Sequence, residues 1–298
     1  MRCTAVINQK GGVGKTTTTV SLGAALALRG KRVLLLDLDP QANLTLHLDR
    51  RPDLEAKTMT NLMVDGAPLR EMIVPCSAEG LSVVPADTSL SGVEQVLANR
   101  IGRETILREA FEDCQGELPF DHVLIDCPPA LGVLSANALV TVDKIVIPMQ
   151  AEYFSLQGMA KLMEVMELVR RRLNPGLEIC MILPCMVNKR ANLANEVIDE
   201  LQRHFGDVLA RNFIRANIKL AEAPSFGRTI FEHAPESNGA LDYAAVADEF
   251  LKRHAGEKLP PADEPAPALE QTESEPPAAP PPSAEAGESP EMAEEGIA

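Results

Sequence analysis

Along residues 1–255, short apolar runs alternate with longer segments whose apolar positions recur at helical spacing. Nearly continuous apolar runs are typical of strands buried on both faces of a parallel sheet, and the longer segments suit crossover helices. The alternation predicts a doubly wound α/β fold, a mostly parallel sheet flanked by helices. The predicted strands are residues 4–8, 32–37, 81–85, 122–126, 144–148, 178–187 and 208–214, and the predicted helices are residues 15–29, 93–111, 156–173, 193–205 and 243–254.

We expect one domain over residues 1–255, because α/β folds of this size commonly form a single unit and no repeat or linker interrupts the pattern. Residues 256–298 differ in composition. From residue 259 onward the chain has ten prolines and ten acidic residues but no lysine, arginine or aromatic residue. Such a segment buries too little apolar surface to offset chain entropy, so we expect a disordered acidic tail. It is either a solubilising appendage, or a docking segment or competitor for a basic surface.

The net charge of −15 is unevenly distributed. Residues from Glu257 onward carry −10, and residues 1–255 carry −5. The acidic character therefore belongs mainly to the tail, and the overall charge does not exclude DNA as a partner.

Composition narrows the class of protein further. Aromatic residues make up 3% of the chain and tryptophan is absent, so the core must rest on aliphatic residues and methionine. No apolar run reaches the ~18 residues of a membrane-spanning helix, and the run near Met1 is too short for a signal peptide. We expect a cytoplasmic protein without a membrane partner. The six cysteines form no Cys-x-x-Cys pair, which favours buried free thiols over a metal site.

A glycine-rich stretch between the first predicted strand and helix carries the clearest chemistry: Lys10-Gly11-Gly12-Val13-Gly14-Lys15-Thr16-Thr17. Glycines let successive backbone N–H groups turn toward one anion, and the positive end of the new helix points to the same place. We expect Lys15 to neutralise phosphate charge, Thr16 to hold magnesium and Thr17 to offer a hydroxyl to the phosphates. The stretch predicts a nucleoside triphosphate site.

The loop departs from the standard spacing Gly-x4-Gly-Lys-Ser/Thr. That spacing would place glycine at position 9, where this chain has Gln9 followed by Lys10. A second lysine beside a phosphate loop is either a solvated charge or a group that contacts phosphate in its own or a neighbouring subunit.

Acidic residues follow two of the predicted strands directly. Asp37 and Asp39 end one strand and Asp126 ends another, and the carboxyl ends of parallel strands meet at one edge of the sheet, where ligands bind. Asp126 occupies the position expected of a Walker B acid, which holds magnesium. Asp37 and Asp39 share a face of an extended chain, so one could approach the metal and the other orient the attacking water. Asp39-Pro40 could also simply form a turn.

Three of these motifs together resemble the deviant Walker A, A′ and B motifs of the ParA/Soj/MinD ATPases: Lys-Gly-Gly-Val-Gly-Lys-Thr-Thr, Asp-Leu-Asp-Pro-Gln and Asp-Cys-Pro-Pro. Two further segments, Pro-Met-Gln-Ala-Glu-Tyr from Pro148 and Leu-Ala-Glu-Ala-Pro-Ser-Phe-Gly from Leu220, resemble the chromosome- and plasmid-partitioning ParA/Soj branch. The resemblance implies a P-loop ATPase with ATP and Mg²⁺ as cofactors, Lys10 as the signature lysine that reaches a partner's phosphates, Asp39 in hydrolysis and Asp126 at magnesium.

The resemblance also implies partners. Family members dimerise on ATP, bind DNA without sequence preference, which places them on the nucleoid, and hydrolyse ATP when a ParB-like protein stimulates them. Asn188 is the best match for an adenine contact, although an ordinary turn asparagine would look the same. The candidate DNA-binding residues are Lys189, Arg190, Arg211, Arg215, Lys219 and Arg228, of which the last four face only Glu222 within residues 208–230. They form either a phosphate-binding patch or a solvated rim.

Other readings of the same loop remain open. A MinD-like membrane cycle would need a basic amphipathic helix at the end of the body, and residues 243–254 instead run into acids and prolines. Iron–sulfur relatives would need interface cysteines, and only Cys127 lies near the site. A dead scaffold is disfavoured by the presence of Lys15, Thr16 and the acids. The chain resembles the short type of ParA, without an operator-binding extension, and the cargo could be a chromosome, a plasmid or a protein cluster.

Overall fold

A computed structural model describes residues 1–53, 55–114, 116–150, 155–188 and 200–257. The chain divides into two units, Met1–Pro260 and Pro261–Ala298, and the description concerns the first. The predicted acidic tail and most of the predicted helix at 193–205 lie outside the described residues, whereas residues 200–205 are helical.

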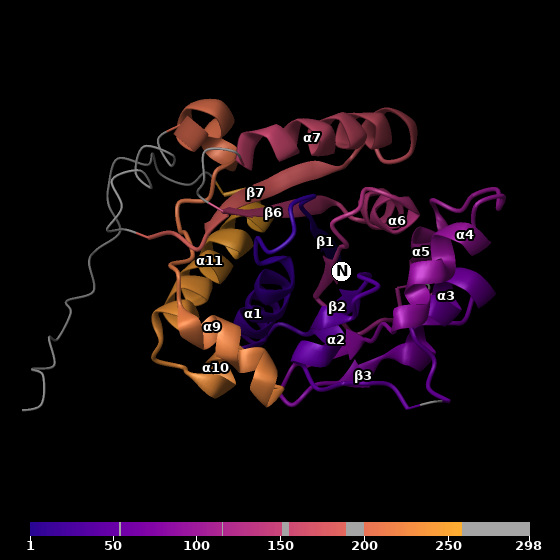
Figure 1. Cartoon of the computed structure of the whole chain (residues 1–298), viewed down its shortest axis with the longest axis horizontal. Helices are drawn as coiled ribbons and strands as arrows, with labels where there is room; N and C mark the ends of the chain where they lie inside the picture. The colour runs from indigo at the N-terminus through magenta and orange to yellow at the C-terminus, as the bar shows by residue number, and fades with distance from the viewer. Residues whose placement is uncertain (54, 115, 151–154, 189–199, 258–298) are drawn as a thin grey trace, which may run out of the picture. The chain divides into compact units, whose positions relative to one another are not determined.

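Seven strands of the described part form one sheet in the order β3-β4-β2-β5-β1-β6-β7 (Figure 1). Every neighbouring pair is parallel except β3 and β4, which run antiparallel. The strands are β1 (Arg2–Val6), β2 (Val33–Asp37), β3 (Val74–Pro75), β4 (Leu81–Val84), β5 (His122–Asp126), β6 (Lys144–Gln150) and β7 (Glu178–Cys185). The prediction of a doubly wound, mostly parallel sheet is therefore confirmed.

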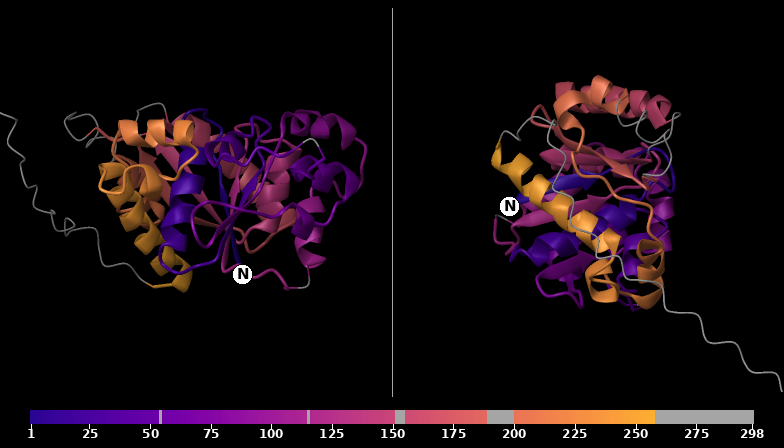
Figure 2. Two further views of the ribbon diagram at one scale, coloured as in Figure 1. Left: turned by 90° about the horizontal axis from the view of Figure 1, so that it is seen from below. Right: turned by 90° about the vertical axis from the view of Figure 1, so that its left-hand side faces the viewer.

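Helices cover both faces of this sheet, as the two views of Figure 2 show. Alternate residues of a buried strand face opposite layers: in β2, Leu34 and Leu36 belong to one apolar cluster, and Val33 and Leu35 to the other. The first cluster includes side chains of α3 (Met59–Asp65), α5 (Ile106–Glu112), α6 (Val133–Thr141) and α7 (Ser155–Arg172), and the second includes those of α1 (Lys15–Ala27), α2 (Asn43–His47), α9 (Ile218–Glu222), α10 (Ile230–His233) and α11 (Asn238–Ala255).

Two element predictions are wrong. The single helix predicted at 93–111 is two helices, α4 (Val93–Val96) and α5, because the intervening chain turns at Gly102, which adopts a left-handed conformation with φ of 74°. The strand predicted at 208–214 is not a strand. The segment begins in a short 3₁₀ turn (Gly206–Val208) and then contacts β7 and its extension through two isolated bridges and a hydrogen bond from Ile214 N–H to the carbonyl oxygen of Pro184.

Candidate nucleotide site

The sheet register brings the loop and the acids together. Val6, the last residue of β1, pairs with Asp126 of β5, which pairs in turn with Asp37 of β2. The chain leaves β1 directly into the glycine-rich loop, and Asp39 follows β2 by two residues. All these groups therefore meet at the carboxyl edge of the central strands, as the sequence predicted.

The loop itself has the backbone that an anion site requires. Gly12 and Gly14 have φ values of 73° and 90°, a left-handed conformation that side chains other than glycine rarely adopt. Helix α1 begins immediately after Gly14, and no side-chain cap occupies its first turn in the described chain. Its first backbone N–H groups therefore point out of the helix without a side-chain acceptor, which is the arrangement that binds phosphate.

Lys15 lies almost buried in this loop, with 8% of its surface exposed. Its Nζ donates a hydrogen bond to the carbonyl oxygen of Lys10 at 3.3 Å. Burial lowers the pKa of Lys15, whereas the nearby charges of Asp126 and Asp39 raise it. The ammonium group is thus positioned between the loop backbone and the acidic edge of the sheet.

Asp126 is fully buried and receives two hydroxyl groups from α1. Thr16 Oγ1 donates to its Oδ2 at 2.7 Å, and Thr19 Oγ1 lies 3.2 Å from its Oδ1. Burial raises the pKa of Asp126 to about 8, and the charge of Asp37 acts in the same direction, whereas the hydrogen bond from Thr16 lowers it. A cation bound beside this carboxyl group would favour its charged form and oppose the rise.

The donor set of this edge fits magnesium. Mg²⁺ prefers oxygen ligands and commonly takes one or two from the protein and the others from phosphate and water. The Thr16 hydroxyl and the Asp126 carboxylate are adjacent oxygen donors. Across the residues that the structure describes, no group of three or more His, Cys, Asp or Glu side chains could hold a metal ion.

The two aspartates at the end of β2 have different surroundings. Asp37 is fully buried and accepts hydrogen bonds from the backbone N–H and hydroxyl of Thr45 at 2.9 and 2.7 Å, and from Asp39 N–H at 3.2 Å. Burial raises the pKa of Asp37 to about 6, and these hydrogen bonds oppose the rise. Asp39 instead lines the pocket, where its Oδ1 accepts from Gln41 N–H at 2.9 Å.

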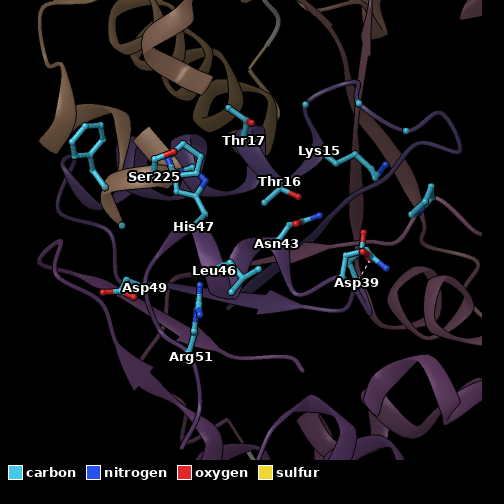
Figure 3. A pocket seen from close by; sticks show the side chains of 18 of the residues that line it. Lys15, Thr16, Thr17, Asp39, Asn43, Leu46, His47, Asp49, Arg51 and Ser225 are labelled. Carbon is cyan, nitrogen blue, oxygen red and sulfur yellow. Dashed lines mark hydrogen bonds between the residues drawn. The ribbon is translucent and has the colours of Figure 1, made fainter. Parts of the chain in front are cut away.

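A pocket of about 830 Å³ opens beside these groups. Figure 3 shows Lys15 and Asp39 at one end, Thr16 near the middle, and His47 and Ser225 at the other end. The sequence predicted the loop residues and Asp39 as site residues. It gave no role in the pocket to the residues that enclose the rest of it, among them Gln41, Asn43, Leu46, His47, Asp49, Arg51, Met186 and residues 224–227. The Ala-Pro-Ser-Phe-Gly segment was visible in the sequence only as a family resemblance.

The remaining predicted nucleotide-site residues are divided between the pocket lining and its surroundings. Lys10 is exposed, and its backbone N–H donates to Asn8 Oδ1 at 3.0 Å, which holds the start of the loop. Asn188 is exposed two residues beyond Met186 and is not part of the pocket lining. Val13 is buried, whereas Gly11, Gly12, Gly14 and Thr17 line the pocket. Cys127 is fully buried within the core beneath the site.

The described residues of the predicted basic patch differ in their surroundings: two side chains form ion pairs, and two others are exposed. Arg215 forms a bidentate ion pair with Asp242 of α11, with its Nη2 2.6 Å from Oδ1. Lys219 pairs with Glu222 at 2.8 Å. Arg211 and Arg228 are exposed, and Lys189 and Arg190 lie outside the described residues. The local count of charges therefore missed Asp242, because the partner of Arg215 lies 27 residues away in the chain.

A phosphate loop after the central strand, a threonine paired with a strand-end aspartate and a second aspartate in the same pocket define a P-loop nucleoside triphosphatase. A family model for the AAA domain matches residues 1–179. The chain belongs to the ParA/Soj family of chromosome partitioning ATPases. The family resemblance and the ATPase activity that the sequence predicted are therefore confirmed.

Curated relatives cover most of the chain. The chromosome-partitioning ATPase Soj of Thermus thermophilus is 45% identical over 85% of this chain and 96% of its own length. The sporulation initiation inhibitor protein Soj of Bacillus subtilis is 43% identical over 82% of this chain and 96% of its own. The chromosome partitioning protein ParA of Caulobacter vibrioides is 40% identical over 85% and 95%, respectively.

Solved structures share the fold. Cobyrinic acid a,c-diamide synthase from Mycobacterium smegmatis, solved with bound ADP and magnesium, has a TM-score of 0.75 and 33% identity over 87% of this chain and 98% of that chain. The cell division ATPase MinD of Pyrococcus furiosus has a TM-score of 0.68 and 24% identity over 84% and 98%, which shows the common fold alone.

Proposed function

We propose that this ATPase works as a switch between an ATP-bound dimer on DNA and a dissociated form, and that a ParB-like partner triggers hydrolysis to move chromosome or plasmid DNA. The observation that carries the proposal is the pocket itself. It combines the phosphate loop, the Thr16–Asp126 pair and Asp39 within a chain of the partitioning ATPase family.

The cofactors are ATP and Mg²⁺, and the roles of the residues follow from their positions. Thr16 and Asp126 would hold the magnesium ion, which neutralises charge on the transferring phosphate. Lys15 adds a second positive charge from within the loop, and the N–H groups of residues 11–17 cradle the phosphates. Asp39 orients the attacking water, since it is the strand-end acid left in the pocket after Asp37 is engaged by Thr45. We retain Asn188 as the proposed adenine contact at the margin of this site.

Lys10 is proposed to complete the site of a second copy. Its side chain is exposed, whereas Lys15 is almost buried within its own loop. An exposed lysine beside a phosphate site has a long, flexible side chain that can reach a phosphate in a facing subunit and neutralise its charge. Dimerisation would then depend on the nucleotide.

DNA association is proposed to rest on exposed cations. Arg211 and Arg228 suit this role best, because Arg215 and Lys219 each have an acidic partner that offsets their charge. Lys189 and Arg190 remain proposed members of the same patch. Phosphate neutralisation of this kind gives sequence-blind, salt-sensitive affinity. We further propose a body over residues 1–255 followed by an acidic tail, and a cytoplasmic location on the nucleoid when ATP is bound.

A MinD-like membrane cycle is the second candidate, and the packing of α11 argues against it. No helix in the described part of the chain is long and apolar enough to cross a membrane. Four apolar residues of α11, Tyr243, Val246, Ala247 and Phe250, are buried in the second apolar cluster, and Leu241 is its exposed large apolar residue among those described, so the helix presents no broad apolar face for lipid. Positioning of a protein cargo rather than DNA would use the same switch with a different partner.

Two lysines test the switch. Lys15→Ala should abolish ATP binding in a calorimetric titration, whereas Lys31→Ala, a lysine outside the nucleotide pocket, should leave it unchanged. Lys10→Ala should bind ATP yet fail to dimerise on it by light scattering. Unchanged ATP affinity of Lys15→Ala would refute the loop assignment, and normal dimerisation of Lys10→Ala would refute the shared site.

A further inference from the structure

The carboxyl group of Asp126 is held at both oxygens by one helical turn. Thr16 and Thr19 are three residues apart on α1, so their side chains lie on the same face of the helix. Thr16 Oγ1 donates to Oδ2 at 2.7 Å, and Thr19 Oγ1 is 3.2 Å from Oδ1. The two hydroxyls therefore define the rotation of the carboxyl plane, which is otherwise a soft torsion.

Thr19 is fully buried, and its single hydroxyl proton has two possible acceptors. Its Oγ1 is 3.0 Å from the carbonyl oxygen of Lys15 and 3.2 Å from Asp126 Oδ1. A hydrogen bond to a carboxylate is roughly twice as strong as one to a neutral carbonyl oxygen, so the Asp126 carboxylate is the stronger acceptor of the two. Loss of the hydroxyl would leave Oδ1 without the donor that Thr19 provides in a fully buried position.

The neighbouring threonine shows what an ordinary buried hydroxyl does in this helix. Thr18 is equally buried, and its Oγ1 lies 3.0 Å from the hydroxyl of Tyr243 on α11. That hydrogen bond joins two helices and does not involve Asp126. Thr18 is therefore a matched control for the loss of a buried hydroxyl from the same turn.

We propose that Thr19 is a positioning residue for the magnesium site: its hydroxyl fixes the Asp126 carboxylate so that Oδ2 stays turned toward Thr16. The inference rests on the proposed function, in which Thr16 and Asp126 hold the ion. Thr19 does not touch the ion or the nucleotide in this role, and it acts only through Asp126.

The test measures magnesium affinity, not turnover. Thr19→Val removes the hydroxyl and keeps the side-chain shape, and ADP binding is titrated calorimetrically across a series of Mg²⁺ concentrations. We expect magnesium to bind the Thr19→Val protein–ADP complex about tenfold more weakly, as is usual when a group that orients a metal ligand is lost. ADP affinity without Mg²⁺ should stay the same. Thr19→Ser should restore magnesium affinity, and Thr18→Val should leave it unchanged.

The outcomes separate the inference from the proposed function. If ADP affinity of the wild-type protein does not depend on Mg²⁺, the magnesium site itself is wrong. If the wild type depends on Mg²⁺ and Thr19→Val responds identically, only the role of Thr19 is refuted. Equal weakening in Thr18→Val would also refute it, because the effect would then be a general loss of buried hydrogen bonding. Thermal unfolding checks that each variant folds, and Thr19→Ala provides the same comparison if the valine variant does not.

Discussion

Asp37 and Asp39 are identical side chains separated by one residue, yet they differ in hydrogen bonding and in their position relative to the pocket. Asp37 ends a strand whose neighbours on both sides are buried, and its oxygens accept hydrogen bonds from Thr45 and Asp39. Thr45 Oγ1 also accepts from Ala86 N–H at 2.9 Å, so the network ties α2 to the chain after β4. Asp39 keeps a carboxylate oxygen in the pocket. Burial thus engages Asp37 in the fold, whereas Asp39 lines the pocket, which is why we propose Asp39 for hydrolysis.

We predict that the two asparagine variants change different properties, turnover for Asp39 and stability for Asp37. Asp39→Asn should bind ATP normally but lower turnover by about 100-fold or more, because a positioned carboxylate contributes about that much to proton transfer. Asp37→Asn should lower the free energy of unfolding by about 1–3 kcal/mol, because the amide replaces one acceptor oxygen with a donor that faces the Thr45 donors. Steady-state phosphate release and urea unfolding measure the two effects. A stable Asp37→Asn protein or a fully active Asp39→Asn enzyme would contradict this division.

At the scale of elements, acidic side chains of α11 bind the segment that follows the 3₁₀ turn Gly206–Val208. Glu249 accepts hydrogen bonds from the backbone N–H groups of Arg211 and Asn212, and Asp242 accepts from the N–H of Arg215. The backbone N–H groups of Ala210 and Ile214 instead donate to the carbonyl oxygens of Ile182 and Pro184 in β7. The segment therefore divides its backbone donors between β7 and the acidic side chains of α11, and it pairs with β7 without forming a continuous ladder.

The packing of α11 also distinguishes an arginine that forms an ion pair, Arg215, from one that is exposed, Arg228. Arg228→Glu should weaken DNA binding in the presence of ATP and lower the slope of log affinity against log salt by about one or two units, because one phosphate contact is lost and a repulsion is added. Its melting temperature should stay the same, since Arg228 is exposed. Arg171→Glu serves as the charge-matched control, because the Arg171 side chain on α7 is 75% exposed and pairs only at the surface with Glu167.

Arg215→Glu should instead destabilise the protein, because the new carboxylate would face Asp242, whose surroundings are partly buried. Fluorescence anisotropy on duplex DNA and thermal unfolding distinguish the two classes. Wild-type DNA affinity and salt dependence in Arg228→Glu would move the patch to other residues.

At the scale of the whole molecule, buried histidines make stability depend on pH. Burial lowers the pKa of His47, His122 and His254 to about 4, below the ordinary value of 6.5. The unfolded chain therefore binds more protons than the folded one between these values, and this contribution to stability is complete above pH 6.5 and lost as the pH falls toward 4. The raised pKa values of Asp37 and Asp126 have the opposite sign, because protonation favours their buried forms.

His47 isolates one of these contributions. His47 is 3% exposed, and its Nε2 lies 3.1 Å from the carbonyl oxygen of Arg228. His47→Gln keeps a donor for that carbonyl but cannot titrate, so its stability should fall less than that of the wild type between pH 7 and 4.5. Each unit of pKa shift corresponds to about 1.4 kcal/mol, and the difference between the two urea-unfolding profiles should reach about 2 kcal/mol. Parallel profiles would show that His47 does not carry the effect.

The sequence by itself determined the fold class, the nucleotide loop and the strand-end acids, because each depends on local spacing: glycines before a helix, apolar runs of strand length and aspartates at their ends. Tertiary structure alone decided which aspartate faces the pocket, which arginine is paired and that Thr19 reaches Asp126. These depend on side chains brought together by the parallel register, from positions 107 residues apart in the case of Thr19 and Asp126. Local periodicity carries no information about such distant partners. Packing against those partners determines how deeply each group is buried and which hydrogen bonds it forms, and burial and hydrogen bonding in turn shift its pKa.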